Sequence, residues 1–396
     1  QITSAADVAE VLDWAFATMA TGRPGPVHIE VPTDVMPLPC DALPAPAPAK
    51  PAVQPAPDAL ANAAQKLNAA ANVVILVGGG SRGQEDALRA LAERLDAPVI
   101  QTVNARGMLH DHPLCVPASP SLEAARALIS ASDQTLAIGT EFGPTDYDMY
   151  VRGGFPDTSA MIRIDISPEQ LARHPAALTL CADAGATMRT LLPLLAAKSA
   201  DGANRAAATR SAARAELADL DILMVKRLEM VETIRSAMPG CLIVGDSTQP
   251  VYAANLYYDH DRPGGWFNAA TGFGALGFGP GAAVGASLAT PGTPVVCLIG
   301  DGGLQFSPGE LRTAVDENLP ITFLVWNNAA FNEIADAMRG ANTEIIGCSP
   351  SPLRMEPFAA ACDLPFTSCP MDAEVLHWAL RQPCDGPRMI EIRVKE

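Results

Sequence analysis

The sequence predicts an α/β protein built on parallel sheets. Short apolar runs rich in β-branched residues alternate with segments whose apolar residues recur at helical spacing, as in residues 72–77 followed by 84–95. The same alternation returns near the C-terminus, where the apolar runs 295–300 and 321–326 flank a helical segment. Parallel strands need a crossover of this kind, because a tight hairpin joins only antiparallel neighbours.

The chain of 396 residues is long enough for two or three domains. Eight prolines among alanines mark one linker, and an alanine-rich polar stretch marks a second connection. We therefore expect five parts: a short opening segment at 1–36, a Pro/Ala linker at 37–57, a middle α/β domain at 58–195, a connecting segment at 196–220, and a second α/β domain at 221–396.

The opening segment is too small to fold alone. Residues 3–19 carry apolar side chains at helical spacing, and residues 25–32 have the alternation of a strand. One helix and one strand cannot bury a core. We expect this segment to be the tail of a domain whose earlier part is elsewhere.

Charge and cysteine content limit the possible partners. The net charge of −17 argues against binding to nucleic acid or to an anionic membrane surface, although it would attract a cationic substrate. The nine cysteines are scattered, with no pairs at zinc-site spacing, which is typical of reduced thiols in a cytoplasmic protein. No apolar run approaches the roughly 20 residues that span a bilayer.

Oxygen-bearing side chains follow two neighbouring strands of the second domain. Asp301 ends the first apolar run within Gly-Asp-Gly-Gly, and Asn328 ends the second. Between them, Ser307, Pro308 and Glu310 have the pattern of a capped helix start. A right-handed strand-helix-strand unit brings both strand ends to one sheet edge, where a carboxylate and an amide oxygen suit Mg²⁺.

This pair of motifs, with residues 303–326 as its spacer, resembles the signature of the thiamine diphosphate (ThDP) enzymes. The resemblance implies that Mg²⁺ is bound by the side chains of Asp301 and Asn328 and by the main-chain carbonyl of Ala330. Asn328 is also expected at the cofactor. The glycines beside Asp301 would let the backbone approach the cofactor phosphate; they are Gly300, Gly302 and Gly303.

Two further segments take cofactor roles by the same resemblance. The glycine-rich stretch 271–285 would supply the carbonyl of Gly274 to the aminopyrimidine and Leu276 as the wedge that bends the cofactor, unless its glycines serve helix packing alone. Thr248 and Gln249, in the loop that follows the strand at 241–244, would hold the terminal phosphate; the alternative is a capped turn.

The middle domain is Rossmann-like by this resemblance, and the C-terminal domain is the diphosphate-binding domain. Residues 78–83 match the GxGxxG pattern of dinucleotide-binding sites. The acidic residue that would contact the ribose is Asp96, but it lies at a predicted helix end, where this contact is not expected. Some members of the family carry FAD in the middle domain, so FAD is kept as an alternative and nicotinamide is not favoured.

The segment His110-Asp111-His112 could be a pair of metal ligands. It lies in a predicted surface loop, and the family has a similar histidine-proline loop without a metal. We expect a structural role for these residues, and also for His28, which lies in the alternation of the predicted opening strand.

By the same resemblance, residues 1–36 form the tail of the pyrimidine-binding domain. The glutamate that activates the cofactor in the family has no counterpart in this sequence, so no catalytic residue is assigned and the isolated chain is expected to be inactive. We expect a homodimer or homotetramer, or a partner chain that supplies the pyrimidine domain.

The expected function is ThDP- and Mg²⁺-dependent decarboxylation of a 2-oxo acid through an enamine. Stretches such as GDSTQPVY and GDGGLQF resemble acetolactate-synthase-like decarboxylases, including the 5-guanidino-2-oxopentanoate type. The alternatives are acetolactate-type carboligation, a non-catalytic ThDP-binding subunit, and a flavin or nicotinamide oxidoreductase built on residues 72–96.

Overall fold

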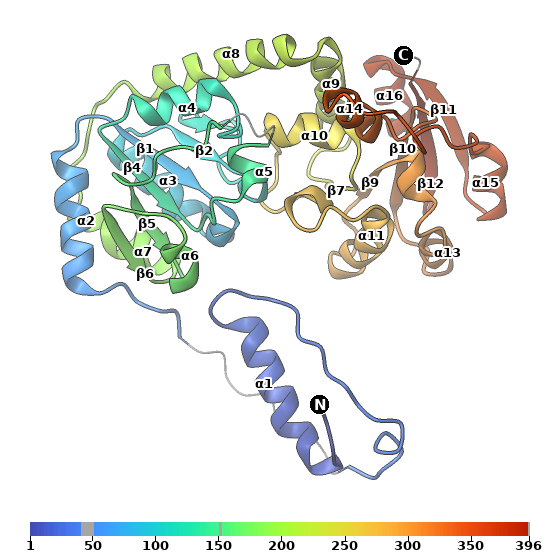
Figure 1. The fold of residues 1–396 in the computed structure, drawn as a ribbon, viewed down its shortest axis with the longest axis horizontal. Coiled ribbons are helices and arrows are strands. Elements are labelled where there is room, and N and C mark those ends of the chain that lie inside the picture. The colour runs from blue at the N-terminus through green and yellow to red at the C-terminus, as the bar shows by residue number, and fades with distance from the viewer. Residues whose placement is uncertain (41–50, 150–152, 395–396) are drawn as a thin grey trace.

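A computed structural model describes residues 1–40, 51–149 and 153–394. Two six-stranded sheets, each with helices packed against it, form two neighbouring lobes (Figure 1). Every pairing between the named strands is parallel. The predicted α/β fold class is confirmed.

The sheet of the middle domain has the order β3-β2-β1-β4-β5-β6. Alternate residues of its central strand face opposite cores: Val73, Ile75 and Val77 pack on one side, and Val74 and Leu76 on the other. A strand buried on both faces explains the continuous apolar run seen in the sequence. The strands are β1 (Val73–Val77), β2 (Val99–Gln101), β3 (Cys115–Val116), β4 (Gln134–Ile138), β5 (Ile162–Asp165) and β6 (Leu178–Cys181).

Helices cover both faces of this sheet. Helices α2, α3 and α7 contribute to one core, and α4 and α8 contribute to the other. The α-helices are α2 (Pro57–Ala69), α3 (Glu85–Leu95), α4 (Glu123–Ser130), α5 (Pro144–Tyr147), α6 (Pro168–Ala172), α7 (Ala184–Leu191) and the long connecting helix α8 (Gly202–Leu220), and single 3₁₀ turns lie at η2 (Gly79–Ser81), η3 (Val103–Ala105) and η4 (Leu192–Leu194).

The C-terminal sheet has the order β11-β12-β10-β9-β7-β8. Strands β9 and β10 are neighbours, and Gly300 pairs with Trp326 in their register. The residues that follow these strands therefore meet at one edge, as the sequence predicted for Asp301 and Asn328. The strands are β7 (Leu242–Gly245), β8 (Trp266–Asn268), β9 (Val295–Gly300), β10 (Ile321–Asn327), β11 (Phe366–Pro370) and β12 (Arg388–Arg393).

Two groups of helices sandwich the C-terminal sheet. Helices α11, α13 and α15 pack on the face that carries Val295, Cys297 and Ile299, and helices α9, α10 and α16 pack on the face that carries Val296 and Leu298. The helices are α9 (Ile222–Ala237), α10 (Gln249–Leu256), α11 (Phe278–Ala289), α12 (Asp301–Leu304), α13 (Gly309–Asp316), α14 (Asn332–Gly340), α15 (Met355–Ala361) and α16 (Ala373–Arg381), with a 3₁₀ turn η5 (Ala269–Thr271).

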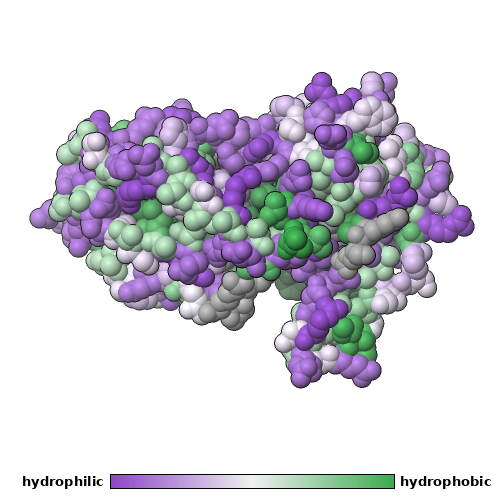
Figure 2. All heavy atoms as spheres, turned by 90° about the horizontal axis from the view of Figure 1, so that it is seen from above, coloured by the Kyte–Doolittle hydropathy of each residue, from purple (hydrophilic) through white to green (hydrophobic). Residues whose placement is uncertain are grey.

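The two lobes share one continuous apolar core, and a buried arginine bridges them. Arg106 is 1% exposed and donates to the carbonyls of Tyr258 (2.8 Å), Asn255 (3.1 Å) and Pro117. Burial lowers its pKa to about 10. Charged and polar residues cover much of the surface seen from above, while hydrophobic residues gather where the lobes meet (Figure 2).

The opening segment forms an arm that projects from the two lobes in Figure 1 and meets the middle domain through an ion pair between Arg23 and Glu141. It holds the 3₁₀ turn η1 (Ala5–Asp7) and helix α1 (Val8–Ala20), as the sequence predicted for a helix. The predicted strand at 25–32 is wrong, because residues 24–32 have no regular secondary structure. They pair with no strand among the described residues, and their contact with the start of the chain is a single bond from Ile2 N–H to Glu30 O at 2.8 Å. A strand needs a partner to satisfy its backbone.

The start of α13 also differs from prediction. Helix α13 begins at Gly309 without a side-chain cap, and Ser307 Oγ instead donates to the carbonyl of Gly277 at 2.8 Å. The serine thus ties the glycine-rich loop to the end of α12. Among the described residues, no helix is long and apolar enough to cross a membrane.

Candidate cofactor site

One cavity of about 290 Å³ opens beyond the carboxyl ends of β7, β9 and β10. Open α/β sheets bind ligands at this position. The structure brings every sequence-predicted cofactor and metal residue to this cavity: Thr248, Gln249, Gly274, Leu276, Gly300, Asp301, Gly302, Gly303, Asn328 and Ala330.

Asp301 lies at the buried end of the cavity and is 5% exposed. Burial raises the pKa of its carboxyl, and the backbone N–H groups of Asn328 and Ala329 act in the opposite direction. These N–H groups place the carboxylate beside the end of β10. A cation bound here would stabilise the charged form of Asp301, which burial destabilises.

A buried amide network fixes the orientation of Asn328. Trp326 Nε1, which can only donate, bonds Gln249 Oε1 at 3.0 Å. The same oxygen accepts from Asn328 Nδ2 at 3.3 Å. The Asn328 Oδ1 atom therefore faces away from Gln249, and it accepts from Ala330 N–H at 3.2 Å. This directs the amide oxygen of Asn328 away from Gln249, in the cavity that Asp301 also lines.

Close packing leaves little room for a side chain at three glycines of the cavity. A Cβ on Gly302 would lie 2.4 Å from the Phe331 ring, and one on Gly303 would lie 2.9 Å from Asp246 Oδ1. A Cβ on Gly300 would approach Thr248 Oγ1 at 3.3 Å. Without side chains here, backbone N–H groups line the cavity beside Asp301.

Asp246 holds the glycine-rich loop against the sheet. Its carboxylate is buried and accepts from Gly279 N–H at 2.8 Å and from Ser247 N–H at 2.8 Å. Burial raises its pKa, and these N–H groups oppose that rise. Ser247 Oγ in turn donates to Gly274 O at 3.0 Å. The contacts set the position of Gly274 and hence of Leu276 at the cavity.

These residues fit a magnesium ion and a diphosphate. Asp301 and Asn328 offer a carboxylate and an amide oxygen, and Ala330 offers a carbonyl within the same cavity. Thr248 and Gln249 are 6% and 3% exposed, and Gln249 Nε2 is buried without a hydrogen-bond partner among the described residues. A buried donor of this kind is satisfied if an anionic oxygen occupies the cavity.

Sequence reasoning missed part of the cavity wall. Helix α14 supplies three of these residues after the Asn-Asn motif, and the charged one among them, Glu333, had no motif to identify it. Trp326 lies within an apolar strand, so its sequence context indicated only a core residue. The missed residues are Ser247, Tyr252, Trp326, Phe331, Asn332, Glu333 and Ile334.

A second cavity of about 620 Å³ lies beyond the middle-domain sheet and is lined by Gly78, Gly79 and Gly80 among other residues. A Cβ on Gly78 would lie 2.3 Å from Gly139 O, so close packing of the two loops explains that glycine. Asp96 Oδ2 accepts from Ala200 N–H at 2.6 Å and is a structural acceptor rather than a ribose contact. The glycine run therefore gives no evidence for a nucleotide-binding site.

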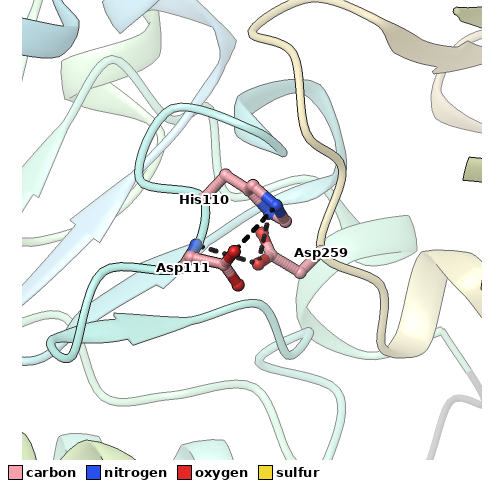
Figure 3. A group of neighbouring side chains, drawn as sticks. All are labelled: His110, Asp111 and Asp259. Atoms are coloured by element: carbon pink, nitrogen blue, oxygen red, sulfur yellow. Dashed lines mark hydrogen bonds and ion pairs between the residues drawn. The ribbon is translucent and has the colours of Figure 1, made fainter. Parts of the chain in front are cut away.

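The two histidines of the 110–112 loop take different partners. His110 Nδ1 lies 2.8 Å from Asp259 Oδ2 of the other lobe, and Asp111 lies beside them (Figure 3). The three possible ligand atoms lie within 4.8 Å of one another. His112 instead meets Glu93 at 3.2 Å. The contacts give both histidines a structural role, and His110 joins the two lobes.

Two family models match the chain. The central domain of thiamine pyrophosphate enzymes matches residues 60–191, and the C-terminal thiamine pyrophosphate-binding domain matches residues 246–392. The chain belongs to the thiamine pyrophosphate enzymes. Thiamine pyrophosphate is the cofactor called ThDP above, and the second model covers nearly all of the cavity described here.

Curated relatives agree with this assignment. The chain is 36% identical over 350 residues to the protein named "Probable 2-ketoarginine decarboxylase AruI" of Pseudomonas aeruginosa, covering 86% of this chain and 61% of the relative. It is 28% identical to acetolactate synthase isozyme 3 large subunit of Escherichia coli, covering 81% of this chain and 59% of that protein. The chain thus spans about three fifths of the length of these relatives.

A solved structure shares the fold. The structure described as "a putative thiamin diphosphate-dependent enzyme isolated from Mycobacterium smegmatis" superposes with a TM-score of 0.77 at 22% identity, covering 99% of this chain and 74% of that one.

Proposed function

We propose that this chain supplies the diphosphate- and Mg²⁺-binding part of a ThDP-dependent enzyme that decarboxylates a 2-oxo acid. The observation that carries the proposal is the meeting of Asp301 and Asn328 in one cavity at the ends of neighbouring strands. The relative named as a 2-ketoarginine decarboxylase supports the reaction class.

Each part of the cavity has a separate task. Asp301, Asn328 and Ala330 would hold the metal, and Thr248, Gln249 and the glycines after β9 would hold the diphosphate. Leu276 would support the cofactor from the glycine-rich loop. When bound, ThDP supplies the carbanion that attacks the 2-oxo group and accepts the electrons released with CO₂. The chain's own contribution is positioning and electrostatic stabilisation.

Acetolactate-type carboligation is the second candidate, because several relatives are named acetolactate synthases. Both reactions begin with loss of CO₂ and differ in whether a proton or a second carbonyl compound is then taken up. A non-catalytic ThDP-binding subunit is the third candidate. We also propose a cytoplasmic location and a homodimer, a homotetramer or a partner chain that completes the active site.

Calorimetric titration of Mg²⁺ and ThDP into the chain tests the binding site. Asp301→Ala and Asn328→Ala should each abolish Mg²⁺-dependent ThDP binding. Asp316→Ala, on the exposed face of α13, is the matched control and should bind as the wild type does. Undiminished binding in both site variants would show that the site is elsewhere.

Product analysis tests the reaction. The complete gene product that contains this chain should be incubated with ThDP, Mg²⁺ and a panel of 2-oxo acids, including pyruvate and 5-guanidino-2-oxopentanoate. Aldehyde and CO₂ would establish the decarboxylase. Acetolactate from pyruvate would establish the carboligase, and ThDP binding without any product would favour the silent subunit.

A further inference from the structure

The cavity contains one charged side chain that cofactor binding does not use. Among the described residues that line it, Asp301 and Glu333 are the only acidic or basic ones. Asp301 is committed to the metal. Resting on the proposed function, we propose that Glu333 recognises a cationic group, such as a guanidinium or ammonium, on the side chain of the 2-oxo acid.

Glu333 lies at the open side of the cavity. It is the second residue of α14 and is exposed as a residue, whereas Asp301 is 5% exposed at the buried end. A cofactor anchored by its diphosphate at Asp301 would leave Glu333 on the more exposed side of the cavity. Partial burial of the carboxyl raises the pKa of Glu333, and Arg227 and Gln249 oppose that rise.

The amide donor of Gln249, which the proposed function offers to the diphosphate, also lies near this carboxylate. Since Trp326 Nε1 and Asn328 Nδ2 both donate to Gln249 Oε1, the amide cannot be flipped, and Nε2 is left as the free end. This nitrogen is buried and makes no hydrogen bond of ordinary geometry with described residues, yet it lies close enough to Glu333 to favour the ionised form. The network therefore fixes the amide of Gln249, whose free end lies near Glu333.

A purely structural role does not fully account for Glu333. An acidic residue in the first turn of a helix is stabilised by the helix dipole, and Arg227 is a nearby cation. However, Arg227 is already bonded to Asp221 at 2.9 Å, and no ion pair within 4.0 Å joins it to Glu333 in the described residues. Among the described residues, no ion pair within 4.0 Å therefore neutralises the Glu333 carboxylate.

The walls beside Glu333 suit an aliphatic stem. Leu276, Phe331 and Ile334 line the same cavity and provide apolar surface. A substrate with a 2-oxo acid at one end, methylene groups in the middle and a cation at the other end matches this order of surfaces. The net charge of −17 would attract such a substrate from a distance.

The test compares a carboxylate ligand whose side chain ends in a cation with one whose side chain is uncharged. With the complete gene product loaded with ThDP and Mg²⁺, calorimetry should give tighter binding for 5-guanidinopentanoate than for hexanoate, by about 10- to 100-fold. Glu333→Gln should remove this preference and leave hexanoate binding unchanged. Asp336→Asn removes an exposed carboxylate from the same helix and should retain the preference.

Kinetics provide a second readout. Glu333→Gln should lower kcat/KM for 5-guanidino-2-oxopentanoate by about 10- to 100-fold, mainly through KM, and leave kcat/KM for 2-oxohexanoate unchanged. Glu333→Lys should bind the anionic 2-oxoglutarate more tightly than the wild type does. A gain of this kind cannot result from misfolding.

The outcomes separate the two proposals. An unchanged preference in Glu333→Gln, or no preference in the wild type, would overturn the role of Glu333 even if 2-oxo acids are decarboxylated. Absence of any decarboxylation, with Glu333-dependent binding of 5-guanidinopentanoate intact, would overturn the proposed function and uphold the cation site.

Discussion

Replacing Asp246 by asparagine tests how the glycine-rich loop is held at the cofactor cavity. The carboxylate accepts two backbone N–H groups at 2.8 Å, one from Ser247 and one from Gly279 at the start of α11. A hydrogen bond to a charged group contributes about 1.5–3 kcal/mol, so the pair contributes roughly 3–6 kcal/mol. Asparagine keeps one acceptor oxygen and turns an NH₂ group toward the other donor.

The net loss should be smaller than that sum, because the neutral amide avoids the cost of burying a charge. We expect Asp246→Asn to lower the free energy of unfolding of the C-terminal domain by about 2–3 kcal/mol. ThDP affinity should fall about tenfold or more, since Gly274 and Leu276 lose their fixed position and tenfold corresponds to about 1.4 kcal/mol.

Tryptophan fluorescence during urea unfolding measures the stability change. Trp266 and Trp326, each 1% exposed, both lie in the C-terminal sheet, whereas Trp14 and Trp378 are 59% and 61% exposed and respond little to unfolding. Asp316→Asn is the matched exposed control. Equal urea midpoints for the two variants, together with wild-type ThDP affinity in Asp246→Asn, would refute the loop-clamp reasoning.

Two further predictions concern buried ionisable groups outside the cavity. Burial lowers the pKa of His260 to about 4 from 6.5, so its stabilising contribution is complete above pH 6.5 and declines as the pH falls toward 4. The free energy of unfolding of the wild type, measured by urea titration, falls between pH 7 and pH 5, and His260→Asn should make this fall smaller by about 2 kcal/mol. A fall of the same size in the variant would contradict this. Arg106→Met should cost about 3–5 kcal/mol and separate the unfolding of the two lobes in scanning calorimetry. Exposed Arg89→Met is its control, and a single wild-type transition in Arg106→Met would contradict the bridging role.

The meeting of the proposed metal and phosphate residues in one cavity could be predicted, because the pattern that places them is local in sequence. Asp301 and Asn328 each directly follow an apolar strand, and a strand-helix-strand unit has one favoured hand, so adjacency in space followed from order along the chain. The fold class was predictable for the same reason, since strand and helix periodicities alternate clearly.

Features that depend on distant partners could not be predicted. Trp326 has the sequence context of an ordinary core residue, and only the arrival of α10 beside β10 gives its indole a polar partner in Gln249. Glu333 reaches the cavity because α14 turns back after the Asn-Asn motif. Ser307 has the pattern of a helix cap, but the carbonyl of Gly277, far away in sequence, competes successfully for its hydroxyl.

The position of β12 has a consequence for biosynthesis. This strand is made after β11 but lies between β11 and β10. Until the ribosome has released residues 388–393, the β10 edge lacks a neighbour, and Asn327 lacks the Glu391 carboxylate that it bonds at 2.6 Å. An unpaired strand edge invites association with other chains. We therefore expect the nascent C-terminal domain to need protection from aggregation until its final strand has been inserted.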